Sequence, residues 1–341
     1  MEKEVISLFV KEGKKTPSKN ESLKICKFID KSKNLYQIFN TLNGIAINKY
    51  ILSSMLSNCN LSLSFKKILF RCIPRSILDY HHFGIAITVF SSNFYSECRK
   101  IFDEVLQENM LDNVIVSNYI NCASRIGDLY ELKRAFYECR KKGCIDTHVY
   151  NLYIQHVGRL DIEETRYAFH DAIKNGYASD RTYSNYISVE NMTGNFDIVR
   201  ETFKIACERK MASFDSYITY IEMLIASDLI SEASRVFVSL NLDIVTKDQN
   251  SFTVDIHLLG PNVGYLAIKL LLDGNICIDI EDGEISNSYG IDNVTIIIER
   301  NSLESIEYLL FMLNKHYPEY IINDHGSTIC LIRRKRKRIP E

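Results

Sequence analysis

The chain has 341 residues, of which 46% are hydrophobic and 25% charged, and this composition excludes an intrinsically disordered or a collagen-like protein. The formal net charge of −2 conceals an uneven distribution: residues 1–80 hold 14 Lys and Arg against 6 Asp and Glu, residues 81–247 hold 18 against 23, and residues 248–341 hold 9 against 14. The basic charge is concentrated at the two ends of the chain, where a polyanion would bind.

The N-terminal residues carry no targeting signal that the sequence reveals. Residues 1–19 are rich in Lys, Glu and Ser, and we expect a flexible basic arm there. They lack the apolar stretch of a secretion signal and are too acidic for an organellar transit peptide. No apolar run reaches the ~20 residues of a membrane span. The sequence therefore predicts a cytoplasmic protein, with mitochondria as the alternative, and no membrane partner.

The ten cysteines include no CxxC pair. Most of them lie on the apolar faces of predicted helices, which is typical of reduced thiols that pack as small core residues. We therefore expect no disulfide framework, no metal site and no cofactor.

Two sequence markers recur every 33 or 34 residues through the middle of the chain. The first marker is a phenylalanine, at Phe102, Phe136, Phe169, Phe203 and Phe237. The second marker is a Tyr-Ile pair, which begins at Tyr119, Tyr153, Tyr186 and Tyr220. Two markers that stay in phase over four copies indicate a tandem repeat.

Each repeat has the pattern of two helices. Apolar residues fall at i, i+4 and i+7, as Leu132, Phe136 and Cys139 do, which places them on one face of a helix. Gly143 and similar residues close the units as helix stops. Such a hairpin buries its apolar faces only by stacking on its neighbours. We therefore predict a mainly α fold, in which an α-solenoid of about six to seven ~34-residue helical hairpins covers residues 20–248 and is followed by a small α/β domain.

The period stops after residue 248. The pattern then predicts a strand, a helix, a strand, a helix and two strands, within residues 251–260, 261–274, 293–299, 302–316, 320–324 and 327–334. This order is typical of a small α/β domain, which we place at residues 249–333. An acidic stretch at residues 273–293 interrupts it, and a basic tail at residues 334–341 follows it.

The repeats over residues 49–247 resemble pentatricopeptide repeats, because a unit runs Val-x-Asn-Tyr-Ile or Tyr-x-Asn-Tyr-Ile or a close variant, then Gly-Asp or Gly-Asn, then a Phe-centred helix. Members of that family bind single-stranded RNA, about one base per unit, through a residue near the start of the first helix and the last residue of the unit. The resemblance implies these pairs: Gly84 with Asn113, Asn118 with Thr147, Leu152 with Asp180, Asn185 with Phe214, and Thr219 with Asp248. Leu152 and Phe214 cannot hydrogen-bond a base, so the base-reading pattern is incomplete. Alternatively, Asn118 and Asn185 are helix-start residues that satisfy backbone groups.

The C-terminal region resembles an Smr (small MutS-related) domain in its element order and in the sequence Val-Asp-Ile-His. Several members of that family cleave nucleic acid. The resemblance implies catalytic roles for Asp255 and His257, which share one face of a strand and together could orient water or a metal, or accept a proton. Residues 298–301, Ile-Glu-Arg-Asn, stand where the family has Thr-Gly-x-Gly. A basic strip could bind phosphate, serve as a localisation signal or remain a solvated end: Arg333, Arg334, Lys335, Arg336, Lys337 and Arg338.

Together these features predict an RNA-binding protein of the pentatricopeptide–Smr type that acts in RNA processing, stability or translation. Single-stranded RNA is the expected partner. One alternative is a protein-interaction scaffold that docks a partner on the acidic concave face of the solenoid. A second alternative is an endonuclease that uses Asp255 and His257, although the incomplete motif favours a protein without enzymatic activity.

Overall fold

The computed structural model describes residues 16–32, 36–38, 42, 45–242, 244–248, 251–273, 293–298, 303–325 and 328–333. It divides into two compact units, residues 1–189 and 190–341, and each unit is described by itself. Most of the predicted basic arm, the acidic stretch between residues 274 and 292 and the basic tail lie outside the described residues.

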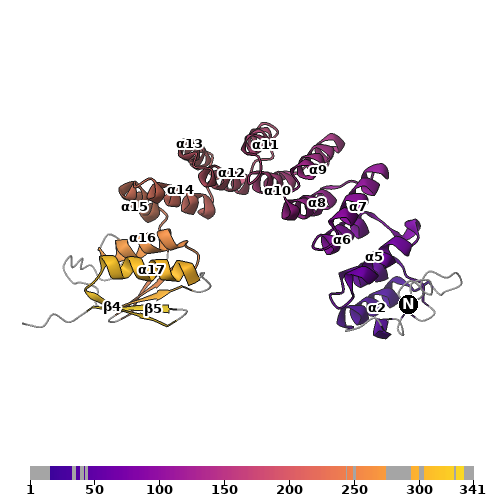
Figure 1. The fold of residues 1–341 in the computed structure, drawn as a ribbon, viewed down its shortest axis with the longest axis horizontal. Coiled ribbons are helices and arrows are strands. Elements are labelled where there is room, and N and C mark those ends of the chain that lie inside the picture. Colours follow the sequence, from indigo (N-terminus) through magenta and orange to yellow (C-terminus); the bar gives the residue numbers. More distant parts are fainter. Residues whose placement is uncertain are drawn as a thin grey trace, which may run out of the picture. The chain divides into compact units, whose positions relative to one another are not determined.

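The first unit is a succession of helical hairpins (Figure 1). Helix α2 (Lys19–Lys31) precedes four hairpins, and α12 (Asp180–Met192) begins the next one. The hairpins are α4 (Lys49–Ser57) with α5 (Leu63–Cys72), α6 (Tyr80–Phe90) with α7 (Tyr95–Gln107), α8 (Asn113–Ile126) with α9 (Leu129–Lys142), and α10 (Thr147–Val157) with α11 (Ile162–Lys174). A 3-10 turn, η1 (Arg75–Ile77), precedes α6. The first helices pack side by side, α4 on α6, α6 on α8 and α8 on α10.

Local sequence signals fix where these helices begin and end. A polar side chain caps each first helix of the four hairpins by accepting a hydrogen bond from a backbone N–H of its first turn. The caps of these first helices are Asn48, Asp79, Asp112 and Asp146. Ser62 caps the second helix α5 in the same way. Gly127 and Gly143 end α8 and α9 with φ angles of 73° and 70°, a left-handed conformation that favours glycine. The predicted role of Gly143 as a helix stop is confirmed.

Stacked aromatic rings join successive hairpins from α7 onward. The marker Phe of a second helix lies flat against the marker Tyr of the following first helix, with ring centroids 3.9 to 4.1 Å apart and interplanar angles of 6° to 12°. The pairs are Phe102–Tyr119, Phe136–Tyr153, Phe169–Tyr186 and Phe203–Tyr220. All eight side chains are buried. The two sequence markers are therefore the two halves of one repeated contact.

The second unit combines the last hairpin helices with the α/β domain. Helices α13 (Phe196–Glu208), α14 (Phe214–Ala226) and α15 (Ile230–Ser239) come first. The elements that follow are β1 (Val245–Asp248), β2 (Ser251–Asp255), α16 (Pro261–Leu272), β3 (Asn293–Ile297), α17 (Leu303–His316), β4 (Tyr320–Asp324) and β5 (Thr328–Arg333). Helices α16 and α17 pack on each other and lie on one face of the sheet (Figure 1).

The five described strands form one sheet in the order β1-β2-β3-β5-β4. Strands β2 and β3 are parallel, with Asp255 opposite Ile297, and the other neighbours are antiparallel. Val254, Ile296 and Leu331 belong to the buried face of this sheet. The predicted fold class, an α-solenoid followed by a small α/β domain, is confirmed, whereas strand β1 has no counterpart among the predicted elements.

Candidate nucleic-acid interface

The first helices of the four complete hairpins of the first unit contain no acidic residue, whereas α12 holds Asp180 and Glu190 and α14 holds Asp215 and Glu222. Helices α4, α6, α8 and α10 have neither Asp nor Glu anywhere in their sequences. Between residues 81 and 176, the acidic residues lie instead on the second helices, at helix caps or in the short connections between helices. Averaging over whole hairpins, as the charge count along the sequence does, hides this separation.

Equivalent positions of the first helices and of the turns that follow them share one side of the hairpins, which we call the first-helix face, and on it Gly84 and Ser91 are buried. Its outer row is Tyr80, Val114, His148 and Arg181. Its middle row is Gly84, Asn118, Leu152 and Asn185. Its inner row is Ser91, Arg125 and Arg159. Within a helix the rows are 4 and 7 residues apart, so they share one side of the helix. Arg125, His148, Arg159 and Arg181 are exposed on this face.

The middle row is held by hydrogen bonds between neighbouring first helices. Asn118 Nδ2 donates to the carbonyl oxygen of Gly84 at 3.2 Å, and Asn185 Nδ2 donates to the carbonyl oxygen of Asn151 at 2.9 Å. Both asparagines are half-buried, and neither Oδ1 accepts a hydrogen bond from any described residue. The predicted backbone role of these asparagines is thus present, but across hairpins, and each amide keeps an acceptor for a ligand. Leu152 is half-buried and interrupts the row.

The predicted unit-end residues are the first residues of the next first helix. Asn113, Thr147, Asp180 and Phe214 begin α8, α10, α12 and α14. Asn113 Nδ2 donates to Oδ2 of the cap residue Asp146 at 2.5 Å, which ties the starts of α8 and α10 together. Asp180 is exposed and Thr147 half-buried. Each unit-end residue lies five positions before the middle-row residue of its own helix.

A groove of about 710 Å³ opens on helices α2, α4 and α6. Lys49, Tyr50, Tyr80 and His81 line it, and Lys49 Nζ lies 5.4 Å from the centroid of the Tyr50 ring. His82 is buried beneath, with Nε2 2.8 Å from the carbonyl oxygen of Lys49. The groove thus combines aromatic side chains with one lysine and with the carboxylates of Asp30 and Asp79. No role was predicted for these side chains from the sequence. They occupy positions that are equivalent to those of the later repeats, and this equivalence could have indicated a role.

Acidic residues on the second helices are paired with cations of the preceding hairpin. The repeated pairs are Arg71–Glu97, Arg99–Glu131 at 3.0 Å, Lys133–Glu164 at 3.3 Å and, in the second unit, Arg200–Glu232 at 3.7 Å. Burial acts to raise the pKa of Glu97, but hydrogen bonds and charge from Arg71 and Lys67 outweigh it and hold the pKa below its usual value. Between residues 81 and 176, much of the acidity therefore belongs to paired carboxylates of the second helices and not to the first helices.

Asp255 and His257 meet at the carboxyl end of strand β2. His257 Nδ1 lies 2.5 Å from Asp255 Oδ1, and the backbone N–H of His257 donates to the same oxygen at 3.1 Å. Each side chain is 41% exposed. Partial burial acts to raise the pKa of Asp255, whereas the hydrogen bonds from His257 lower it, and the net result is a lowered pKa. The two residues are brought together as expected, but residues 299–301, the other half of the Smr-like motif, lie outside the described residues.

The remaining residues that were predicted to form a site belong neither to the first-helix face nor to the Asp255–His257 pair. Thr219 is half-buried on α14, at the position equivalent to Asn185. Asp248 lies in β1, whose backbone pairs with β2, and Arg333 ends β5 opposite Tyr320. Arg334, Lys335, Arg336, Lys337 and Arg338 lie outside the described residues.

None of the described helices is long and apolar enough to cross a membrane. No three His, Cys, Asp or Glu side chains of the described residues cluster so that they could hold a metal ion.

The fold defines a helical-hairpin repeat protein that ends in a small α/β domain. No family model matches the sequence, and none of the curated proteins matches it. Among solved structures, the pentatricopeptide repeat protein PPR10 from maize is similar with a TM-score of 0.47 and 15% identity, over 70% of this chain and 36% of that chain. PPR10 in complex with an 18-nt psaJ RNA element is similar with a TM-score of 0.44 and 15% identity, over 55% of this chain and 29% of that chain. The matched region is about a third of the length of PPR10.

Proposed function

We propose that the protein binds single-stranded RNA along its first-helix face, as a pentatricopeptide-like repeat protein. The observation that carries this proposal is the absence of acidic residues from α4, α6, α8 and α10, together with the exposed cations of the same face. RNA affinity depends on cations close to phosphates, and a nearby carboxylate would oppose it. Arg125, Arg159 and Arg181 are the phosphate-binding residues of this proposal.

The middle row supplies contacts to the bases. Single-stranded bases are recognised by hydrogen bonds to their edges, and the Oδ1 atoms of Asn118 and Asn185 are positioned acceptors on half-buried side chains. Leu152 between them offers only apolar contact. The expected recognition is therefore discontinuous, with two asparagine positions separated by one that does not select a base by hydrogen bonding.

The groove on α2, α4 and α6 extends this surface toward the N-terminus. Tyr80 is 58% exposed and lies with His81 and Lys49 around the groove. Bases stack on exposed aromatic rings whatever their sequence, and a neighbouring cation binds the backbone. The groove therefore supplies base stacking without selectivity, while Asp30 and Asp79 on its lining disfavour a phosphate close to them.

A direct test measures binding of a fluorescent single-stranded oligoribonucleotide by anisotropy at several salt concentrations. The double variant Arg159→Glu, Arg181→Glu reverses two charges on the first-helix face. The matched control Lys141→Glu, Lys174→Glu reverses two exposed charges on second helices and changes the net charge equally. We expect the first variant alone to lose about tenfold or more in affinity and to show a weaker salt dependence. Equal losses in both variants, or no binding by the wild type, would contradict the proposal.

The contact between Asp255 and His257 supports a second candidate function, an Smr-like endonuclease that would give the protein a role in RNA processing. An imidazole that a carboxylate holds in place can serve as a general base for attack by water. RNA cleavage by the wild type that both Asp255→Asn and His257→Gln abolish, with RNA affinity retained, would establish this activity. An uncleaved substrate would leave an RNA-binding protein without enzymatic activity.

The scaffold alternative requires a different surface from the one first expected. Because α4, α6, α8 and α10 contain no acidic residue, an acidic docking surface on these hairpins would have to use the second helices, where Glu131 and Glu164 are already paired. A partner that binds there would leave RNA affinity unchanged, which separates the two functions experimentally.

A further inference from the structure

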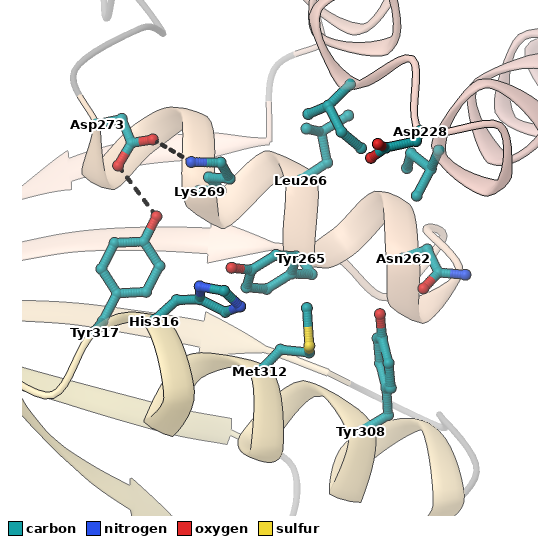
Figure 2. A pocket seen from close by; sticks show the side chains of 12 residues that line it. Asp228, Asn262, Tyr265, Leu266, Lys269, Asp273, Tyr308, Met312, His316 and Tyr317 are labelled. Atoms are coloured by element: carbon teal, nitrogen blue, oxygen red, sulfur yellow. Dashed lines mark hydrogen bonds and ion pairs between the residues drawn. The ribbon is translucent and has the colours of Figure 1, made fainter.

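A pocket of about 540 Å³ lies within the second unit, between the α14–α15 hairpin and helices α16 and α17 (Figure 2). Its volume is in the range of small-molecule sites. The first-helix face does not include it, and neither Asp255 nor His257 lines it. Its lining consists of two apolar walls with a few polar groups between them, which is the usual composition of a ligand site.

The two walls suit a flat ligand. Ile225, Ile230 and Leu266 form an aliphatic wall. The second wall consists of Tyr265 and His316, whose ring centroids are 6.1 Å apart with 48° between the ring planes, so that a planar ligand would lie flat on one of the two rings, and the Met312 thioether lies beside them (Figure 2). Aromatic rings and thioethers both pack favourably on the face of a planar ring.

The polar groups of the pocket are able both to donate and to accept. The side chains of Asn262, Tyr265, Tyr308 and His316 form no hydrogen bond with any described residue. An amide, a phenol and an imidazole can each offer a donor and an acceptor. A ligand whose edge alternates N–H groups with carbonyl or ring-nitrogen acceptors would satisfy them.

The charges of the pocket argue against a bound phosphate. Lys269 Nζ lies 2.7 Å from Asp273 Oδ2, and the Tyr317 hydroxyl donates to Asp273 Oδ1 at 3.1 Å (Figure 2). The cation of the pocket is therefore already neutralised. Asp228, exposed at the α14–α15 turn, adds a negative charge to the lining. A ligand that stacks and hydrogen-bonds but keeps its phosphate outside fits these observations.

We propose that this pocket holds one unpaired nucleobase of a bound single-stranded RNA. The proposal rests on the proposed RNA-binding function and adds to it a base-binding site in the second unit that is separate from the helical repeats' middle row. A free nucleoside has the same base chemistry, so the test includes both sources.

The test uses the full-length protein with fluorescent oligo(A) and oligo(U) ribonucleotides and, separately, with adenosine and uridine in calorimetry. Tyr308→Ala and His316→Ala remove exposed rings from the pocket, Tyr308 being 38% exposed, so neither change empties the core. Tyr130→Ala removes a ring that is 71% exposed on α9 and serves as the matched control. We expect Tyr308→Ala and His316→Ala to weaken RNA binding about tenfold, the scale of one lost base stack, and Tyr130→Ala to leave it unchanged.

Each other outcome has a distinct meaning. Unchanged RNA affinity in Tyr308→Ala and His316→Ala, while Arg159→Glu, Arg181→Glu binds more weakly, would overturn the pocket assignment and leave the proposed function standing. A wild type that binds neither oligoribonucleotide would overturn the proposed function and the pocket assignment together. Nucleoside binding that Tyr308→Ala abolishes, with RNA affinity unchanged, would overturn RNA as the source of the base.

Discussion

The ring of Phe136 lies flat on the ring of Tyr153, with centroids 3.9 Å apart and 6° between the ring planes. Phe136 belongs to the second helix of one hairpin and Tyr153 to the first helix of the next. The Tyr153 hydroxyl donates to Glu164 Oε1 at 2.9 Å, and Lys133 of the preceding hairpin lies 3.3 Å from Glu164 Oε2. One tyrosine therefore connects apolar packing between hairpins to the ion pairs on the second helices.

Phe136→Leu should destabilise the first unit by about 1 to 3 kcal/mol, because the ring stack and part of the buried volume are lost while the core stays apolar. Urea unfolding followed by circular dichroism measures the change. Tyr130→Leu, at a side chain that is 71% exposed, should change stability by less than about 0.5 kcal/mol. Similar losses in both variants would show that the stacks do not hold the hairpins together.

Tyr153→Phe should cost about 1 to 3 kcal/mol, since it leaves the stack intact but removes a buried donor to a carboxylate. Tyr137→Phe offers a matched comparison, because Tyr137 donates to the same Glu164 Oε1 at 2.8 Å from a side chain that is 39% exposed. Water replaces the lost hydrogen bond there, so the cost should be distinctly smaller. Equal losses of stability in the two variants would show that burial of the Tyr153 hydroxyl does not decide the cost of losing this hydrogen bond.

Leu152→Asn should restore the interrupted middle row. By analogy with Asn118 and Asn185, the new amide can donate to a backbone carbonyl of α8, a bond worth about 0.5 to 1.5 kcal/mol. RNA affinity should rise as well, because the row would gain a base-contacting acceptor. Thermal unfolding and anisotropy measure the two effects, and Asn118→Leu should show the reverse of both. A gain in stability without a gain in affinity would separate the row from RNA binding.

Glu97→Gln should destabilise the protein at neutral pH by on the order of 1 kcal/mol, because Arg71 and Lys67 lose a partner in a pair that solvent partly screens. The lowered pKa of Glu97 in the folded state means that its contribution is fully present above pH 4.5, its ordinary value, and disappears as the pH falls through the lowered pKa. The stability difference between wild type and variant should therefore shrink only in acid. A difference that is the same at pH 7 and at strongly acidic pH would contradict this assignment.

Glu222→Gln should have the opposite dependence on pH. Burial raises the pKa of Glu222, so the folded state binds its proton more tightly than the unfolded state, and ionisation destabilises the fold. The carboxylate lies against Gly260, where an added Cβ would be 2.6 Å from Oε1. The variant should be more stable than wild type at pH 7, and this advantage should vanish below pH 4.5. Unfolding at several pH values tests the sign.

Much of the fold follows from the sequence, for reasons that particular residues make clear. Phe136 and Tyr153 are fully buried, so their spacing revealed both the helices and the stacking of hairpins. Their face-to-face contact could not be predicted, because a period shows which residues are equivalent and not which ones touch. Strand β1 is four residues long and is defined only by its pairing with β2. The position of β5 between β3 and β4 likewise depends on long-range pairing.

The candidate interface could be predicted only in part. The family resemblance selected Asn118 and Asn185, which are half-buried on the exposed face. Arg125, Arg159 and Arg181 were missed, because a charge summed over a long span of the chain does not show on which side of a hairpin a single cation lies. The pocket of the second unit had no sequence signal, since its lining comes from four helices and their connections.

The repeated Phe–Tyr contact also has a consequence for how the chain can change in length. From α7 to α14, each hairpin offers its successor a phenylalanine that stacks on the successor's tyrosine, so these four junctions use the same two complementary parts. A gene duplication or deletion that covers one whole period would join compatible ends and would require no compensating substitution. Proteins of this design can gain or lose a module in a single genetic event.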